Sequence, residues 1–212
     1  MKKILTTAIL CAGLVGFTAC DSFLDEEPKS SLTLDTYYKT SADIIGNVNY
    51  LYRDGAPDKM GNMTGAYRGS SLSVMNMVTG YFVNEYEGQE VDCSYARQLT
   101  RQNFTQSCCN YLTNDTWKGC YKSINVANAV IKYVDGVEMD GQAQYKAEAR
   151  FFRALNYFYL VKMFGDVPMI TEPTEDATLV EYPARTAASE VYKTVIIPDL
   201  QFAVENLSLI HI

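Results

Sequence analysis

Residues 143–164, AQYKAEARFFRALNYFYLVKMF, decide the fold of this chain. Apolar residues recur through this stretch at steps of three and four, the period of an amphipathic α-helix. Gly165 provides a stop directly after the last of them, and Pro168 prevents the helix from continuing. The predicted apolar stripe consists of Ala147, Phe151, Ala154, Leu155, Phe158 and Val161.

A second amphipathic helix is predicted just before this one, over residues 115–134. Asp115 is placed to cap its N-terminus, and Asp135 with Gly136 ends it. Its apolar residues, at steps of four and three, are Cys120, Ile124, Ala127, Ile131 and Val134. Two such helices joined by a short turn form an antiparallel hairpin, which needs a neighbouring hairpin to cover its apolar face.

The hairpin partly matches the spacing of large and small residues in tetratricopeptide (TPR) repeats. The matching residues are Trp117 and Tyr121 in the first helix and Ala147 and Phe151 in the second. We therefore predict an all-α fold of TPR-like helical hairpins with long irregular loops.

Other stretches of the chain predict shorter helices and one long loop. Residues 40–52 read as a helix capped by Ser41, with an apolar face formed by Ile44, Val48, Leu51 and Tyr52. A short helix is predicted over 70–82, and residues 84–113 read as a long irregular connection. Residues 187–206 read as a helix interrupted at Pro198, which lacks an amide proton.

The N-terminus has the pattern of a bacterial lipoprotein signal. Lys2 and Lys3 precede an apolar run over residues 4–17, which is too short to span a bilayer. Small residues then lead to Cys20, the predicted site of lipid attachment, where two or more acyl chains would anchor the protein to a membrane surface. The alternative is ordinary secretion with cleavage near Ala19 and an incidental cysteine.

Charge and histidine content exclude several classes of function. The formal net charge is −7, and it becomes −9 once Lys2 and Lys3 leave with the signal. Nucleic-acid binding needs clustered basic residues, so we expect no nucleic-acid partner. The one histidine, His211, is the penultimate residue of the sequence, so catalysis by a nucleophile paired with an imidazole is not expected in this chain.

Four cysteines remain after the signal and the acylated residue: Cys93, Cys108, Cys109 and Cys120. The adjacent Cys108 and Cys109 do not suit a bond with each other, because neighbouring positions rarely satisfy disulfide geometry. A bridge from Cys93 to this pair and free buried thiols both remain open. The spacing does not favour zinc, and no metal or other cofactor is predicted.

Several blocks of the sequence resemble the SusD/RagB family, the surface glycan-binding lipoproteins of Bacteroidetes. One block follows Cys20 as Asp21-Ser22-Phe23-Leu24-Asp25, and another begins at Trp117 and runs through Tyr121 to Asn128. The most specific runs from Ala147 to Leu155 and continues to Phe164-Gly165-Asp166-Val167-Pro168. We interpret the conspicuous residues of this last block as structural, with Phe151, Leu155 and Phe158 filling the groove between helices and Glu148, Arg150 and Arg153 forming ion pairs.

The resemblance implies that this chain is the front portion of a longer all-α protein with four TPR-like units. Residues 1–19 would be the signal peptide, 20–38 a lipidated tether, and 39–207 an incomplete N-terminal helical domain. Residues 208–212 depart from the family pattern, which implies a non-native tail there. The acidic residues after Cys20 look like a surface-export signal, which would place the protein on the outer face of the outer membrane.

In function, the resemblance implies a binding protein rather than an enzyme. It would capture an oligosaccharide or another nutrient, in some members a peptide, and deliver it to a TonB-dependent transporter of the SusC type. Sugar sites combine aromatic platforms with amides, acids and arginine. From their chemistry and their place in the loops before the helix at 115, the candidate ligand-binding residues are Tyr81, Tyr86, Tyr95, Arg97 and Asn103.

Two rival functions stay open. A TPR-like structural or assembly lipoprotein would present its helices to a protein partner and bind no small ligand. A surface glycosidase would need two carboxylates roughly 5 to 10 Å apart. Four acids lie close together in the sequence, Glu85, Glu87, Glu90 and Asp92, but acids are too numerous in this chain for that cluster to discriminate.

Overall fold

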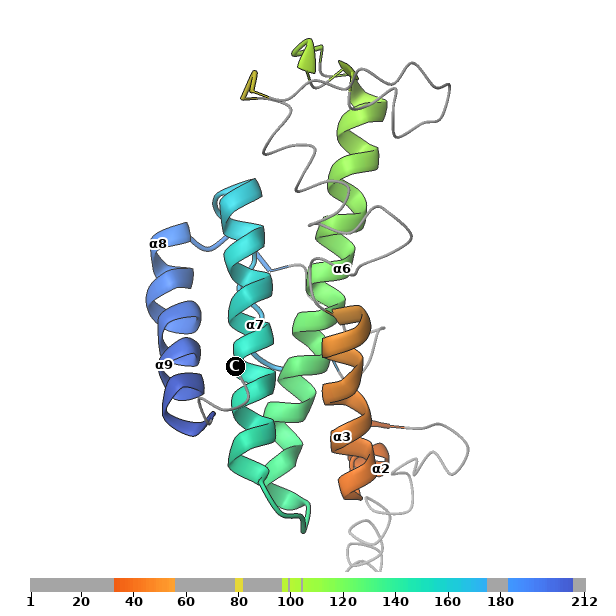
Figure 1. The fold of residues 1–212 in the computed structure, drawn as a ribbon, viewed down its shortest axis with the longest axis vertical. Helices are drawn as coiled ribbons and strands as arrows, with labels where there is room; N and C mark the ends of the chain where they lie inside the picture. The colour runs from red at the N-terminus through yellow and green to blue at the C-terminus, as the bar shows by residue number, and fades with distance from the viewer. Residues whose placement is uncertain are drawn as a thin grey trace, which may run out of the picture. The chain divides into compact units, whose positions relative to one another are not determined.

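The computed structural model describes residues 33–55, 79–81, 97–98, 100–103, 105–174 and 183–207. The secondary structure of these residues is helical, apart from one antiparallel β-bridge. Two long helices, α6 (Gln106–Tyr133) and α7 (Gln142–Phe164), lie side by side. Helix α3 (Ser41–Tyr50) lies beside α6, and α9 (Ile197–Asn206) lies beside α7 (Figure 1). The all-α class predicted from the sequence is therefore confirmed.

The central hairpin forms where the sequence predicts it, but its first helix begins earlier. Helix α6 starts at Gln106, so Asp115 lies inside the helix and is not its N-cap, and the predicted irregular stretch over 84–113 is helical from Gln106 onward. The polar composition there resembles a loop, yet no glycine or proline interrupts the sequence between Gln106 and Lys118. The helix can therefore continue through this polar region.

The turn and both ends of the hairpin follow the predicted stop signals. Helix α6 ends in a 3₁₀ turn, η3 (Val134–Gly136), and α7 begins after Gly141, whose φ of 75° is in the left-handed region that favours glycine. Helix α7 ends at Gly165, with φ of 70°, whose N–H donates to the carbonyl of Val161 at 2.9 Å. These ends confirm the predicted bounds of α7 to within one residue.

The first helical segment packs on this hairpin through an apolar face. Ile44, Val48 and Leu51 are buried as predicted, whereas Tyr52 is 50% exposed. The predicted cap, Ser41, is wrong by one residue. Thr40 is the N-cap, and its N–H and hydroxyl donate to the Asp43 carboxylate at 2.8 and 2.7 Å.

The start of the helical domain also differs from the predicted boundary at residue 39. Helix α2 (Leu34–Tyr37) precedes α3, and Tyr38 is buried and stacked on Tyr133 with ring centroids 5.2 Å apart. Residues assigned to the tether from the sequence therefore contribute to the core. The predicted helix at 70–82 lies mostly outside the described residues; the described part, 79–81, is a turn.

The helical segment that contains Pro198 has a π-helical turn just before the proline. Helix α8 (Ala188–Val191) continues through a π-helical turn, η5 (Tyr192–Ile196), into α9, where Pro198 occupies the first turn. A proline there lacks a donor for the preceding turn, and a π turn is a common way for a helix to absorb such a defect. The predicted interruption is therefore a local change of pitch rather than a break.

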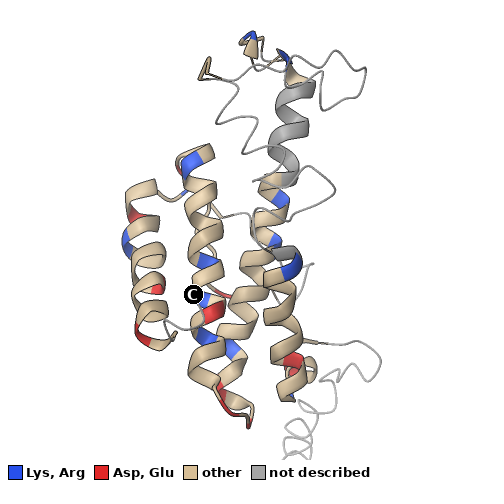
Figure 2. Ribbon diagram, viewed as in Figure 1, with Lys and Arg blue, Asp and Glu red and all other residues tan. Residues whose placement is uncertain are grey.

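Burial along α7 corrects the predicted stripe. Phe151 and Phe158 are 38% and 37% exposed, and the space between the helices is filled instead by Phe152, Tyr157 and Leu160. Helix α7 contacts α3 and α6 on one side and α9 on another, so its buried surface is broad rather than a single stripe. Phe151 and Phe158 lie at its margin. Charged residues of both signs are dispersed over the described helices (Figure 2).

Candidate functional site

Two of the predicted ligand-binding residues, Arg97 and Asn103, lie in a short segment that precedes α6 and that we call the turn before α6. Arg97, Gln98 and Thr100 are helical there, and a turn at Arg101 and Gln102 leads to Asn103. The N–H of Asn103 donates to the carbonyl of Gln98 at 2.8 Å, and the N–H of Arg101 donates to the carbonyl of Arg97 at 3.1 Å. The hydroxyl of Thr105 donates to Oε1 of Gln98 at 2.7 Å, which closes the turn with a side-chain contact. Asn103 is exposed and Arg97 is half-buried, so the turn presents an amide to solvent beside a guanidinium.

The backbone of this turn is strained at Gln102. Its φ is 53°, and it is the one non-glycine residue with a positive φ among those that the structure describes. The left-handed conformation costs a residue with a side chain roughly 1 kcal/mol or more. Strain of this kind often occurs at ligand sites, which is consistent with a functional role for the turn.

Of the other three candidates, Tyr81 alone lies among the residues that the structure describes. Tyr81 ends a separate turn after Gly80, is 89% exposed, and its N–H donates to the hydroxyl of Thr79 at 3.3 Å. Tyr86 and Tyr95 lie outside the described residues, as does Cys20. Of the five candidates, the structure thus brings together Arg97 and Asn103.

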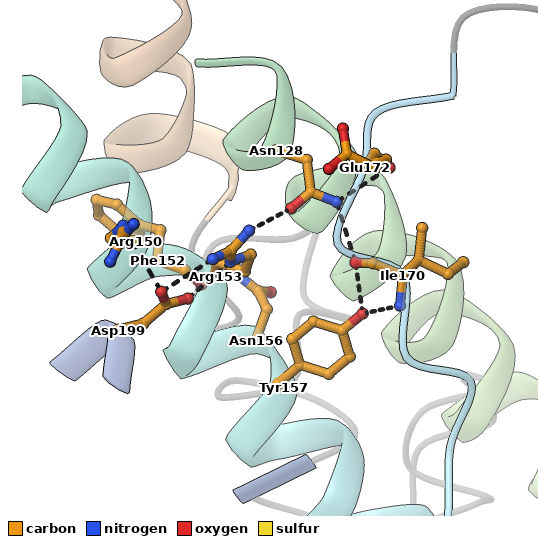
Figure 3. A network of polar contacts seen from close by, with 9 residues as sticks. All are labelled: Asn128, Arg150, Phe152, Arg153, Asn156, Tyr157, Ile170, Glu172 and Asp199. Atoms are coloured by element: carbon orange, nitrogen blue, oxygen red, sulfur yellow. Dashed lines mark hydrogen bonds and ion pairs between the residues drawn. The ribbon is translucent and has the colours of Figure 1, made fainter. Parts of the chain in front are cut away.

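A buried polar network connects three helices and was not predicted as a unit (Figure 3). At its centre, Arg153 of α7 donates from Nε and Nη2 to the two carboxylate oxygens of Asp199 in α9, at 2.7 and 2.9 Å. Its Nη1 donates to Oδ1 of Asn128 in α6 at 2.9 Å. All three side chains are at least nine-tenths buried. The interhelical ion pair expected of Arg153 is confirmed, and its partner is Asp199.

The neighbouring charged residues of the same sequence block behave differently. The guanidinium of Arg150 lies 4.2 Å from the ring centre of Phe202 in α9 and 3.8 Å from the Asp199 carboxylate. Glu148, which was also expected to pair, instead accepts a hydrogen bond from Gln144 at 3.0 Å. Arg150 therefore adds a cation–π contact between α7 and α9. Glu148 is bonded within α7 by Gln144 and also interacts with the side chain of Tyr52, whose pKa it helps to raise.

Asn128 also anchors the extended segment that follows α7, residues 167–174, which we call the strap. Its Nδ2 donates to the carbonyls of Ile170 and Glu172 at 3.0 and 3.3 Å. The side-chain Oδ1 of Asn125 accepts from the N–H of Thr174 at 2.7 Å, and the Tyr121 hydroxyl donates to the Pro168 carbonyl at 2.7 Å. Side chains of α6 thus hold every second residue of the strap.

Tyr157 of α7 completes the support of the strap. Its hydroxyl donates to the carbonyl of Ile170 at 2.8 Å and accepts from the N–H of the same residue at 2.6 Å. Burial raises the pKa of Tyr157 to about 12 and also raises the pKa of Tyr121. Both hydroxyls therefore remain protonated donors at neutral pH.

The loop that contains the strap is closed at its base. Val167 and Thr186 exchange both backbone hydrogen bonds, at 3.2 and 2.9 Å. The Asp166 carboxylate accepts from the N–H of Ala188 at 2.9 Å, and its carbonyl accepts from the Arg185 side chain at 3.2 Å. These contacts connect the end of α7 to the start of α8.

Of the four cysteines expected to remain, the structure describes the side chain of Cys120 alone. Cys120 is fully buried with a free thiol, and burial raises its pKa to about 12. The side chains of Cys93, Cys108 and Cys109 are not described, so the predicted bridge from Cys93 stays a prediction. No group of potential metal ligands is found within the described part of the chain. Nor does any helix in that part combine the length and hydropathy needed to cross a membrane.

Comparison with known proteins defines the class of this helical protein. Residues 22–211 match the SusD-like family described as "Starch-binding associating with outer membrane". The chain is 30% identical over 210 residues to SusD-like protein P2 of Formosa agariphila, covering 98% of this chain and 38% of that protein. It is 29% identical to a SusD-like protein of Bacteroides ovatus, over 97% of this chain and 34% of the relative. The chain therefore belongs to the SusD-like family.

Solved structures of the family show the same fold. A SusD superfamily protein of Parabacteroides distasonis superposes with a TM-score of 0.60 at 25% identity, covering 77% of this chain and 33% of that one. A laminarin-binding SusD-like protein superposes with a TM-score of 0.62 at 25% identity, covering 80% and 35%. The TPR-like reading of the hairpins is thereby confirmed. The chain spans little more than a third of the length of these relatives.

Proposed function

We propose that this chain is part of a surface lipoprotein that captures glycan and delivers it to a SusC-type transporter. The observation that carries the proposal is the family match over residues 22–211, supported by the fold shared with a laminarin-binding SusD-like protein. The homologues are carbohydrate-binding proteins, and we extend that role to this chain. Binding rather than hydrolysis is proposed.

The turn before α6 supports a sugar site on chemical grounds. Arg97 and Asn103 supply a guanidinium and an exposed amide on a closed, strained backbone. Tyr81 offers an exposed ring. Aromatic rings stack on the apolar C–H faces of sugars, while amides and guanidinium groups bind the hydroxyl rim. We propose that Tyr86 and Tyr95 provide further rings of the same site.

The remaining parts of the proposal concern location and delivery. Cys20 is proposed as the lipidated residue, with the signal ahead of it removed. An acyl anchor holds a protein at a membrane surface without a spanning helix. The family description places its members at the outer membrane, which suits a protein that passes ligand to a transporter there.

Calorimetry with a full-length protein tests the ligand site. Replacing Tyr86 and Tyr95 by alanine is expected to weaken binding of laminarin oligosaccharides, or of whichever tested glycan binds, by at least about tenfold, since each stacked ring contributes roughly 1 kcal/mol or more. The matched control replaces the same residues by phenylalanine, which retains the rings. Unchanged affinity in the alanine variant would remove these tyrosines from the site, and co-purification of a barrel transporter tests the delivery step separately.

A further inference from the structure

Asn128 is the side chain at which the polar network of α9 meets the strap. Its amide accepts at Oδ1 from Nη1 of Arg153 at 2.9 Å, and it donates from Nδ2 to the carbonyls of Ile170 and Glu172 at 3.0 and 3.3 Å. An asparagine amide is planar, with an acceptor on one side and a donor on the other. Turning it over would place N–H groups against N–H groups and a carbonyl against carbonyls. The guanidinium of Arg153 therefore fixes the direction in which Asn128 donates.

The position of that guanidinium depends in turn on α9. Nε and Nη2 of Arg153 donate to the two carboxylate oxygens of Asp199 at 2.7 and 2.9 Å, and this bidentate geometry fixes the orientation of the planar group. All three side chains are buried, so a lost contact is not simply replaced by one to water. Asp199, Arg153 and Asn128, which we call the relay, therefore connect α9 to the strap through consecutive hydrogen bonds (Figure 3).

We propose that the relay makes the hold of α6 on the strap conditional on the packing of α9 against α7. When α9 moves away, Arg153 becomes a buried charge without its carboxylate, and it must turn towards water or another acceptor. Asn128 then loses the partner of its Oδ1, its amide reorients, and its hydrogen bonds to the strap carbonyls are lost. The strap therefore loosens whenever α9 detaches, as one local opening of the structure. The inference concerns motion within this chain and does not depend on glycan binding.

Other contacts of the strap limit how far it loosens. Three further side chains of α6 and α7 hold it directly, and the bridge between Val167 and Thr186 closes its base. Loss of the relay should therefore loosen the middle of the strap without freeing its base. The N–H of Ile170, which donates to the Tyr157 hydroxyl at 2.6 Å, reports on the middle. The N–H of Val167, which donates to the carbonyl of Thr186 at 3.2 Å, reports on the base.

Hydrogen exchange of Asp199→Asn, measured in the full-length protein, tests the relay from its far end. Asparagine keeps the size of the side chain but removes the charge that holds Arg153 in place. We expect the N–H of Ile170 to exchange at least about fivefold faster, and that of Val167 to keep its rate. Val48→Ala is the matched control, because Val48 is buried in α3 and packs on the other side of the hairpin. It should speed exchange in α3 and leave the rate at Ile170 unchanged.

Asn128→Asp tests whether the effect passes through this one side chain. Aspartate still accepts from Arg153 but has no N–H for the strap, so Ile170 should exchange faster while the amides of α9 keep their rates. Adding Asp199→Asn to Asn128→Asp should then change the rate at Ile170 no further. Should Asp199→Asn fail to fold, Arg153→Lys takes its place, since a lysine keeps the charge but not the fork that holds two partners at once. Unchanged exchange at Ile170 in these variants, or an effect of Asp199→Asn that persists in full beside Asn128→Asp, would overturn the proposal.

Discussion

The α6–α7 hairpin is covered on its two sides by different chemistry. On the α3 side, Ile44, Val48 and Leu51 pack against apolar residues of the hairpin, among them Val130 and Phe152. On the other side, apolar residues that include Val167, Val191 and Val195 also pack against the hairpin. There a further set of residues holds α9 and the strap through hydrogen bonds and through the ion pairs of Asp199 with Arg153 and Arg150. The other residues of this set are Tyr121, Asn125, Asn128 and Tyr157.

The difference concerns how each side specifies its geometry. Apolar packing stabilises in proportion to the area buried and tolerates small shifts of one element against another. A buried polar group is stabilising only when its partners are in place, because an unpaired one keeps the full cost of desolvation. Substitutions on the α3 side should therefore reduce stability in proportion to the apolar area they remove. Removing one member of the network should cost more, because its buried partners are then left unpaired.

The largest expected effect comes from breaking the network at its centre. Arg153→Leu leaves the Asp199 carboxylate buried without its bidentate partner, and loss of one member of a buried ion pair costs roughly 4 kcal/mol. Urea denaturation followed by circular dichroism measures the change. The double variant Arg153→Leu with Asp199→Leu removes both charges and is expected to recover part of the loss. A single variant as stable as the unaltered chain would show that the network adds little to the fold.

A smaller loss in the free energy of unfolding is expected when a buried residue on the α3 side is shortened. Leu51 is fully buried, and Leu51→Ala should cost about 3 kcal/mol through lost burial and the cavity left behind. Leu200→Ala is the matched control, because Leu200 is 39% exposed on α9 and should lose much less in the same denaturation experiment. If Leu51→Ala destabilises more than Arg153→Leu, the ranking of the two sides is reversed.

The two sides also differ in how far the sequence could predict them. The helices of the hairpin, their stop signals and the buried residues of α3 follow from apolar period and from glycine and proline positions. The network does not, because Arg153 and Asp199 lie 46 residues apart and no local pattern pairs them. A usable signal was present, since Asn128 and Asp199 each interrupt an apolar face, where an unpaired polar group would be costly.

The candidate ligand site was harder to predict for a different reason. Arg97 and Asn103 were chosen by residue type and by position before the helix, and the structure places both in one turn. The start of α6 at Gln106 rather than at 115 shortens the loop that could carry ligand-binding residues. Helix boundaries in polar sequence are set by tertiary contacts and by the absence of breakers, which residue preference alone does not reveal.

The smallest expected effect on stability comes from removing the Tyr157 hydroxyl of α7, which supports the strap. Tyr157→Phe retains the buried ring but removes the group that donates to, and accepts from, Ile170, at a cost of about 1–2 kcal/mol at neutral pH. Tyr145→Phe, at a half-buried tyrosine outside the network, is the control in the same urea titration. Hydrogen exchange should locate the loss in the strap, at the amide of Ile170, rather than in α3.

The same variant has a defined pH dependence. Burial raises the pKa of Tyr157 to about 12, above the value of about 10 for an unfolded tyrosine. The unfolded chain therefore loses this proton first, so the contribution of Tyr157 is complete below pH 10 and is lost as pH rises towards 12. Phenylalanine cannot ionise, so the stability gap between the unaltered chain and Tyr157→Phe should narrow over that interval. A gap that stays constant between pH 9 and pH 11 would mean that the Tyr157 hydroxyl is open to solvent and that the strap is not closed over it.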